Sequence, residues 1–137
     1  MKILNEKPPF LDKIIAAGMN PSLDRTVFTY GDTIYNPSGK NVPDYLIEHE
    51  EVHCDQQGND PKAWWDKYLK DPVFRLNQEL EAYAAQYAYM CAVVRDRNKR
   101  ARILHEIANV LSGPTYGGSI DYQFASEAVK RLSRVKP

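Results

Sequence analysis

A stripe of large apolar side chains between residues 76 and 94 sets the architecture of this chain. The stripe consists of Leu76, Leu80, Tyr83, Tyr87, Met90 and Val94, with spacings of 4, 3, 4, 3 and 4 residues. Such spacing follows one face of an α-helix, and the preceding Asp71-Pro72 is typical of an N-cap followed by the first helical residue. The pattern therefore predicts a long helix over residues 72–97 with one buried face.

Shorter elements are predicted on both sides of this helix. Asp60-Pro61 and Pro43-Asp44 are further helix starts, and Gly31-Asp32 is a two-residue hairpin signal between two runs of β-branched and aromatic residues. The predicted helices cover residues 10–17, 43–57, 61–70, 99–112 and 123–134, and the predicted strands cover 26–30 and 33–36. We expect a mainly helical α+β fold, with a small hairpin before the 43–57 helix and residues 1–9 as a loose arm.

The length and charge of the chain limit the classes of function that it can have. A chain of 137 residues is typical of one domain, so we expect a single domain over residues 1–137. Lys and Arg total 18 and equal Asp and Glu, which argues against a nucleic-acid partner bound through a basic field. We find no signal peptide and no apolar run near the roughly 20 residues that span a bilayer. A cytoplasmic protein with no membrane partner and reduced cysteines is expected.

The residues that indicate chemistry are His49-Glu50-Glu51-Val52-His53, an H-E-x-x-H motif. On a helix, two residues four apart lie about 40° apart on one face, so both imidazoles can converge on one metal ion. The glutamate after the first histidine projects about 100° further round, where it can accept a hydrogen bond from a metal-bound water. The motif requires a helix, which the 43–57 segment is predicted to form.

A catalytic zinc site usually has a third protein ligand, and the downstream candidates are Glu79, Glu81 and His105. On the predicted 72–97 helix, Glu79 lies about 60° from the apolar stripe and Glu81 about 140° from it. Glu79 can therefore point towards a neighbouring helix, whereas Glu81 faces solvent. His105 is expected on a helix surface.

The motif followed by Glu79-Leu80-Glu81-Ala82 resembles the gluzincin pattern of zinc metallopeptidases. The wider chain is similar to small single-domain zincin-like proteins of bacteria and phages. This resemblance implies a minimal zincin-like metallopeptidase domain in which His49, His53 and Glu79 bind Zn²⁺ and Glu50 is the general base. It also implies that the hairpin strand before the motif helix lines the cleft for a peptide or protein substrate.

Peptide hydrolysis also needs a donor to the developing oxyanion. Tyr116, in the glycine-rich segment 113–118, is the first candidate for this catalytic role, and His105 is the second. An extended substrate could add to the edge of the 26–36 hairpin through backbone hydrogen bonds. The leading hypothesis is a zinc-dependent peptidase.

Two alternatives stay open at this point. One is a catalytically inactive zincin-like domain that acts as a binding or assembly module, with Cys54 or His105 closing a four-ligand zinc site. The other is a helical interaction protein that binds no metal. Adjacent tryptophans, Trp64 and Trp65, must point in different directions on a helix, so one is expected in the core and the other at a cleft or partner surface.

Overall fold

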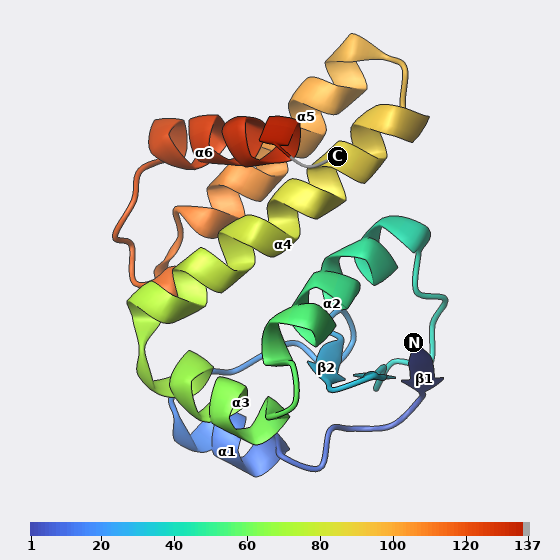
Figure 1. The fold of residues 1–137 in the computed structure, drawn as a ribbon, viewed down its shortest axis with the longest axis vertical. Coiled ribbons are helices and arrows are strands. Elements are labelled where there is room, and N and C mark those ends of the chain that lie inside the picture. Colours follow the sequence, from blue (N-terminus) through green and yellow to red (C-terminus); the bar gives the residue numbers. More distant parts are fainter. Residues whose placement is uncertain (136–137) are drawn as a thin grey trace. The chain divides into compact units, whose positions relative to one another are not determined.

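A computed structural model describes residues 1–135 of the chain (Figure 1). These residues form a mainly helical α+β structure with one small sheet, which confirms the mainly helical α+β class expected from the sequence. The chain divides into two compact units, the first being Met1–Asp71 and the second beginning at Pro72. The single domain expected over residues 1–137 stays a prediction.

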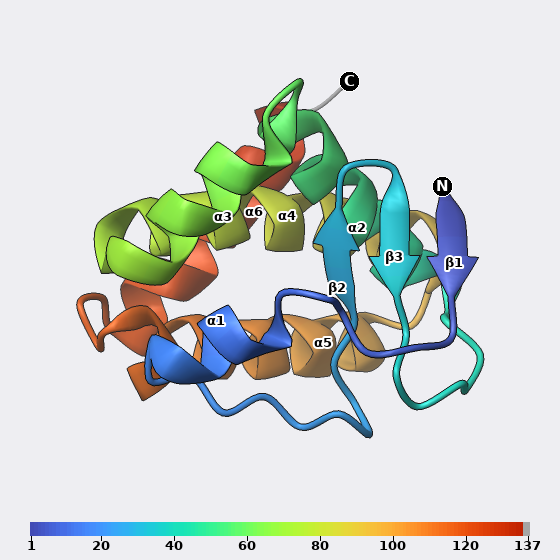
Figure 2. The same cartoon turned by 90° about the horizontal axis from the view of Figure 1, so that it is seen from below.

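The first unit contains the sheet, whose strands are β1 (Lys2–Leu4), β2 (Phe28–Tyr30) and β3 (Thr33–Tyr35), in the order β1-β3-β2 (Figure 2). Strands β2 and β3 form the predicted antiparallel hairpin. Gly31 takes a φ of 60°, which suits the first central position of a type II′ turn.

The N-terminal segment differs from the expected loose arm, because Lys2–Leu4 forms β1 and pairs in parallel with β3. Ile3 lies opposite Ile34, and Asn36 N donates to Leu4 O at 2.8 Å. A strand of three residues is too short to show alternation, and its parallel partner lies about thirty residues away along the chain. The sequence pattern therefore could not reveal this pairing.

The helices of the first unit are α1 (Leu11–Ala16), α2 (Asp44–Gln57) and α3 (Pro61–Lys70), close to their predicted ranges. Asp60 is the N-cap of α3, and its side chain accepts a hydrogen bond from Ala63 N at 3.0 Å. Pro43 is the N-cap of α2 and not its first helical residue. Helix α2 packs against β2, and Gly58, whose φ is 55°, is its C-cap.

The second unit consists of α4 (Pro72–Val93), α5 (Arg97–Leu111), the 3₁₀ helix η1 (Pro114–Tyr116) and α6 (Tyr122–Val135). Helices α4, α5 and α6 pack on one another around an apolar core to which Leu76 and Leu80 of the predicted stripe contribute (Figure 1). Tyr83 and Tyr87 of the same stripe pack against this core. The first four residues of the stripe therefore face inward, as the spacing predicts, whereas Val94 lies beyond the end of α4.

Helix α4 ends before residue 97, because Asp96 begins a new helix. Its side chain accepts hydrogen bonds from Asn98 N and Lys99 N, which makes it the N-cap of α5. Arg100 donates from its guanidinium to the carbonyls of Val94 and Arg95 just after α4. Asp96 thus pairs with N–H groups at the start of α5, and Arg100 holds the segment between the two helices.

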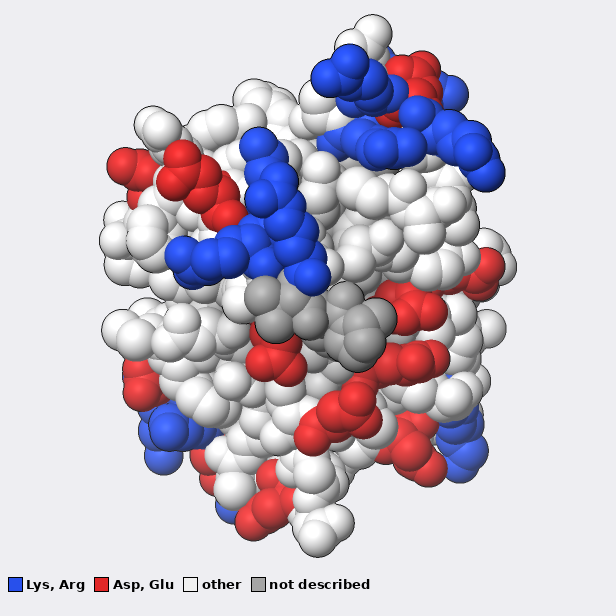
Figure 3. Space-filling model, turned by 45° about the horizontal axis from the view of Figure 1, so that its top comes forward, with Lys and Arg blue, Asp and Glu red and all other residues white. Residues whose placement is uncertain are grey.

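The zero net charge is the sum of two unequal parts. By sequence, the first unit has eight Lys and Arg against twelve Asp and Glu, and the second has ten against six. Figure 3 shows Lys and Arg gathered in groups on one face. The exposed cationic residues of the second unit include Arg97, Arg102 and Lys130. Composition therefore argues against a nucleic-acid partner for the whole chain but not for the second unit by itself.

No helix within residues 1–135 has both the length and the apolar character needed to cross a bilayer.

Gln57, the last residue of α2, fastens this helix to the outer edge of β2. Its Nε2 donates to Thr29 O at 2.8 Å, and its Oε1 accepts from Gly31 N at 2.6 Å. Trp65 Nε1 donates to the same Thr29 carbonyl at 2.8 Å. The buried amide of Gln57 thus pairs with two groups of the strand edge, much as a neighbouring strand would.

Replacing Gln57 should loosen this attachment. Gln57→Ala leaves Gly31 N without its amide partner near the protein interior, so the free energy of unfolding should fall by about 1–3 kcal/mol. Urea unfolding measures the change. Gln123→Ala, at an exposed position of α6, is the matched control and should change it by less than about 0.5 kcal/mol. Equal losses for the two variants would contradict the proposed role of Gln57.

Candidate metal centre

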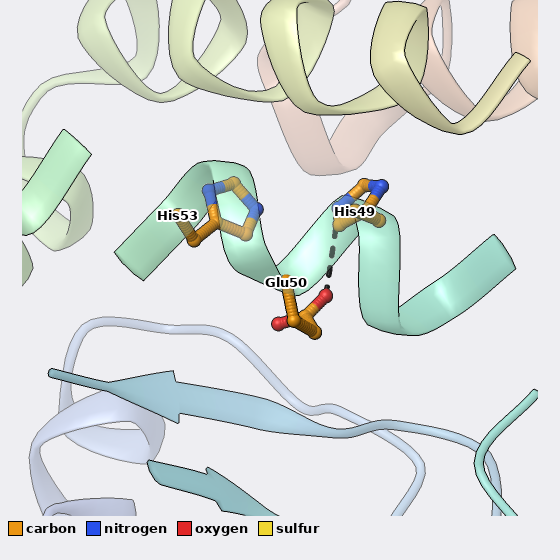
Figure 4. A group of neighbouring side chains, drawn as sticks. All are labelled: His49, Glu50 and His53. Atoms are coloured by element: carbon orange, nitrogen blue, oxygen red, sulfur yellow. Dashed lines mark ion pairs between the residues drawn. The ribbon is translucent and has the colours of Figure 1, made fainter. Parts of the chain in front are cut away.

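His49, Glu50 and His53 lie together on α2 and are buried, each about 5% exposed (Figure 4). Among residues 1–135, they form the one group of His, Cys, Asp or Glu side chains able to hold a metal ion, with one potential ligand atom from each lying within 4.8 Å of the others. The rings of His49 and His53 have centroids 4.9 Å apart. The helical spacing of the motif thus brings both imidazoles together, as the sequence predicts.

The tautomer of His53 is set by its neighbour one turn along the helix. Its Nδ1 lies 2.8 Å from Gln56 Oε1. An amide oxygen can only accept, so Nδ1 carries the hydrogen and the lone pair is on Nε2. A histidine that ligates a metal through one nitrogen commonly donates from the other to an oxygen in this way. The arrangement therefore suits ligation through His53 Nε2.

Glu50 is held between the sheet and the first histidine. Its Oε1 accepts a hydrogen bond from Thr29 Oγ1 of β2 at 2.8 Å, and its Oε2 lies 3.7 Å from His49 Nε2. Figure 4 shows Glu50 on the side of α2 that faces the strands. One oxygen is anchored by Thr29, and the other is directed to the neighbourhood of the imidazoles.

An aromatic wall lies beside His53. The ring of Trp64 on α3 has its centroid 5.3 Å from that of His53, and it stacks on Tyr68 at 4.8 Å. Trp64 is buried, whereas Trp65 is half-buried, which confirms that the adjacent tryptophans point in different directions. The wall limits the orientations open to the His53 ring.

The other two predicted site residues, Glu79 and Tyr116, belong to the second unit. Glu79 is 6% exposed and Glu81 is exposed, which confirms the predicted faces of α4. Ligation by Glu79 stays a prediction. Tyr116, on η1, is 6% exposed and belongs to the apolar core of its unit, a position that favours packing. Its catalytic role as an oxyanion donor also stays a prediction.

Neither alternative ligand belongs to the group that the described residues form. Burial, followed by the charges of Asp55 and Asp32, raises the pKa of the Cys54 thiol. His105 is exposed on α5, where its Nδ1 lies 2.8 Å from Tyr122 Oη and its Nε2 lies 3.0 Å from Asn109 Nδ2. These contacts support a surface role for His105.

Sequence reasoning missed the residues that support the motif. Gln56 lies three residues after His53 on the same helix, so helical spacing could have revealed it. Thr29 is 21 residues from Glu50, and no local pattern indicates that contact. The contacts made by Thr29 and Gly31 also limit the expected edge pairing, because Gln57 and Trp65 occupy Thr29 O and Gln57 occupies Gly31 N.

The link between Thr29 and Glu50 can be tested by a double-mutant cycle. Thr29→Val removes the hydroxyl that a buried carboxylate uses, so it should lower the free energy of unfolding by about 1–3 kcal/mol. In a Glu50→Ala background the same change should cost less than about 0.5 kcal/mol, because the partner is gone. Chemical unfolding of the four proteins gives the coupling. Strictly additive costs would show that the two side chains do not interact.

No protein-family model, curated protein or solved structure matches the chain. The gluzincin resemblance therefore rests on the motif at residues 49–53 and on the context of Glu79.

Proposed function

We propose that the chain is a zinc-dependent peptidase of the gluzincin type, with a zincin-like fold and its metal held by His49 and His53. The observation that carries the proposal is the buried group on α2, whose three side chains offer ligand atoms within 4.8 Å of one another. Two imidazoles four residues apart on one helix can both bind Zn²⁺, and the nearby carboxylate of Glu50 can then serve as the base.

The surroundings of the motif support a metal site over two packed histidines. The Nδ1–H of His53 is directed to Gln56, so the electron pair that a metal needs is on Nε2. Glu50 has one oxygen on Thr29 and the other near His49. This division of contacts suits a base that stays in place while one oxygen exchanges a proton.

When bound, Zn²⁺ supplies Lewis-acid chemistry, polarising the scissile carbonyl and acidifying water. Glu50 Oε2 would accept the proton of the attacking water and later deliver it to the leaving amine. Thr29 keeps the carboxylate aligned during both transfers by donating to Oε1. In this proposal Glu79 is the third ligand, a peptide or protein is the substrate, and Tyr116 is the candidate donor to the oxyanion.

The ligand assignment predicts which variants lose metal. His49→Ala, His53→Ala and Glu79→Ala should each weaken zinc binding more than about 100-fold, because removing a direct ligand costs more than removing a residue that orients one. Competition with a chromogenic chelator on the full chain measures the affinity.

The chain offers a matched control for each type of ligand. His105→Ala removes an exposed imidazole, and Glu81→Ala removes an exposed carboxylate from the same helix as Glu79. Both should bind zinc as the unaltered protein does. If Glu79→Ala kept full affinity, the third-ligand assignment would be wrong. If both histidine variants kept full affinity, the metal centre itself would be wrong.

The role of Glu50 predicts a separation of metal binding from hydrolysis. Glu50→Gln keeps the shape of the side chain and its acceptor for Thr29 but cannot take a proton. Zinc affinity should stay within about threefold while peptide hydrolysis falls about 10²–10⁴-fold, the usual contribution of a general base.

A quenched-fluorescence peptide library, cleaved by the zinc-loaded protein, measures this activity. Zinc binding without cleavage of any library peptide by the unaltered protein would contradict the peptidase proposal and favour the inactive binding or assembly module. Full activity in Glu50→Gln would show that Glu50 is not the general base.

A further inference from the structure

A second candidate site lies in the first unit, away from the motif. It is a groove of about 470 Å³ formed by the segment before α1, by α1, by the hairpin and by α3. Its aromatic lining consists of Phe10, Tyr30, Tyr35 and Trp65. This volume lies within the range usual for ligand sites, and nothing in the proposed peptidase chemistry uses it.

The groove and the metal centre lie on opposite faces of the sheet. Side chains alternate between faces along a strand, so Thr29, which contacts Glu50, points away from the face that carries Tyr30. Phe28 lies opposite Tyr35 across the hairpin, which places Tyr35 on the same face as Tyr30. The groove is therefore separate from the side of the sheet that α2 covers, and its role does not depend on the metal.

Phe10 is the centre of the aromatic lining. Its ring centroid lies 4.7 Å from that of Trp65, 5.4 Å from that of Tyr30 and 6.4 Å from that of Tyr35. All four rings are half-buried, so each is packed on one side and open on another. Trp65 is fixed by its hydrogen bond to Thr29 O. The rings form a preformed apolar surface that needs little ordering when a ligand binds.

The charges around the groove cancel. Asp12 and Lys13 contribute one charge of each sign from α1, and Lys62 pairs with Asp66 on α3 at 3.1 Å. A nucleic acid, a polyphosphate or a polycation would find no net attraction here. The complementary occupant is an uncharged apolar one.

Hydrogen bonding further limits the chemical class of ligand that the groove can hold. The indole N–H of Trp65 already donates to Thr29 O, so it is committed within the protein. Proline residues have no backbone N–H, and a polyproline II helix keeps its carbonyls in solvent while its rings pack on aromatic side chains.

We propose that this groove binds a proline-rich segment of a partner protein in the polyproline II conformation. The rings of Phe10, Tyr30, Tyr35 and Trp65 provide the surface on which successive prolines pack. The cancelled rim charges set no requirement for charged residues within the bound segment.

The chain contains two tryptophans, which supplies a direct reporter. Trp64→Phe leaves Trp65 in the groove as the single indole. Adding an oligoproline peptide should shift the Trp65 emission to shorter wavelength with a saturable dependence on concentration, because the ring loses contact with water. A glycine–serine peptide of equal length should cause no saturable shift.

A pair of tyrosine variants locates the binding surface. Tyr35→Ala, made on the Trp64→Phe background, should raise the dissociation constant for oligoproline about tenfold, because aromatic anchors dominate such contacts. Tyr45→Ala removes the same atoms from an exposed position of α2, outside the groove, and should leave the constant unchanged. Circular dichroism checks that each variant folds.

The emission titration of Trp64→Phe with Tyr35 intact decides the proposal even if Tyr35→Ala fails to fold. No saturable shift up to millimolar oligoproline would overturn it. So would equal affinity in folded Tyr35→Ala, or a shift produced by an oligosaccharide and not by oligoproline. Zinc affinity, measured on the protein with both tryptophans intact, distinguishes failure of this proposal from failure of the metal centre.

Discussion

The attachment of α2 to the outer edge of β2 is the interaction on which the candidate site depends. Gln57 bonds to Thr29 O and Gly31 N, and about two helical turns earlier Glu50 accepts from the Thr29 hydroxyl. These contacts fix both the rotation of the helix and its position along the strand. The orientation of His49 and His53 follows, since both leave the same helix four residues apart.

The same contacts account for the neighbouring aromatic residues. Trp65 donates to Thr29 O from α3, while the adjacent Trp64 lies against His53. One carbonyl of a three-residue strand therefore connects α2, α3 and the sheet. The metal centre and the aromatic groove lie on different faces of this sheet and are stabilised by a common set of contacts, although their proposed ligands are unrelated.

Local signals predicted most of the elements, and contacts between distant segments escaped them. Asp60-Pro61 predicted the start of α3, and the spacing from Leu76 onward predicted the buried face of α4. Both signals involve residues that are close together in the sequence. Strand β1 and the contact of Thr29 with Glu50 depend on folding in three dimensions. The motif predicted that the side chains of His49 and His53 converge. The hydrogen bond from Thr29 that supports Glu50 could be identified only in the folded structure, because the two residues are far apart in the sequence.

The most direct test of the central claim is the X-ray absorption spectrum of the full chain loaded with one equivalent of Zn²⁺. The account predicts nitrogen and oxygen neighbours at about 2.0–2.1 Å, with multiple scattering from two imidazoles. A sulfur neighbour at about 2.3 Å would contradict it by indicating a cysteine ligand. A spectrum of hydrated zinc without imidazole scattering would contradict it altogether.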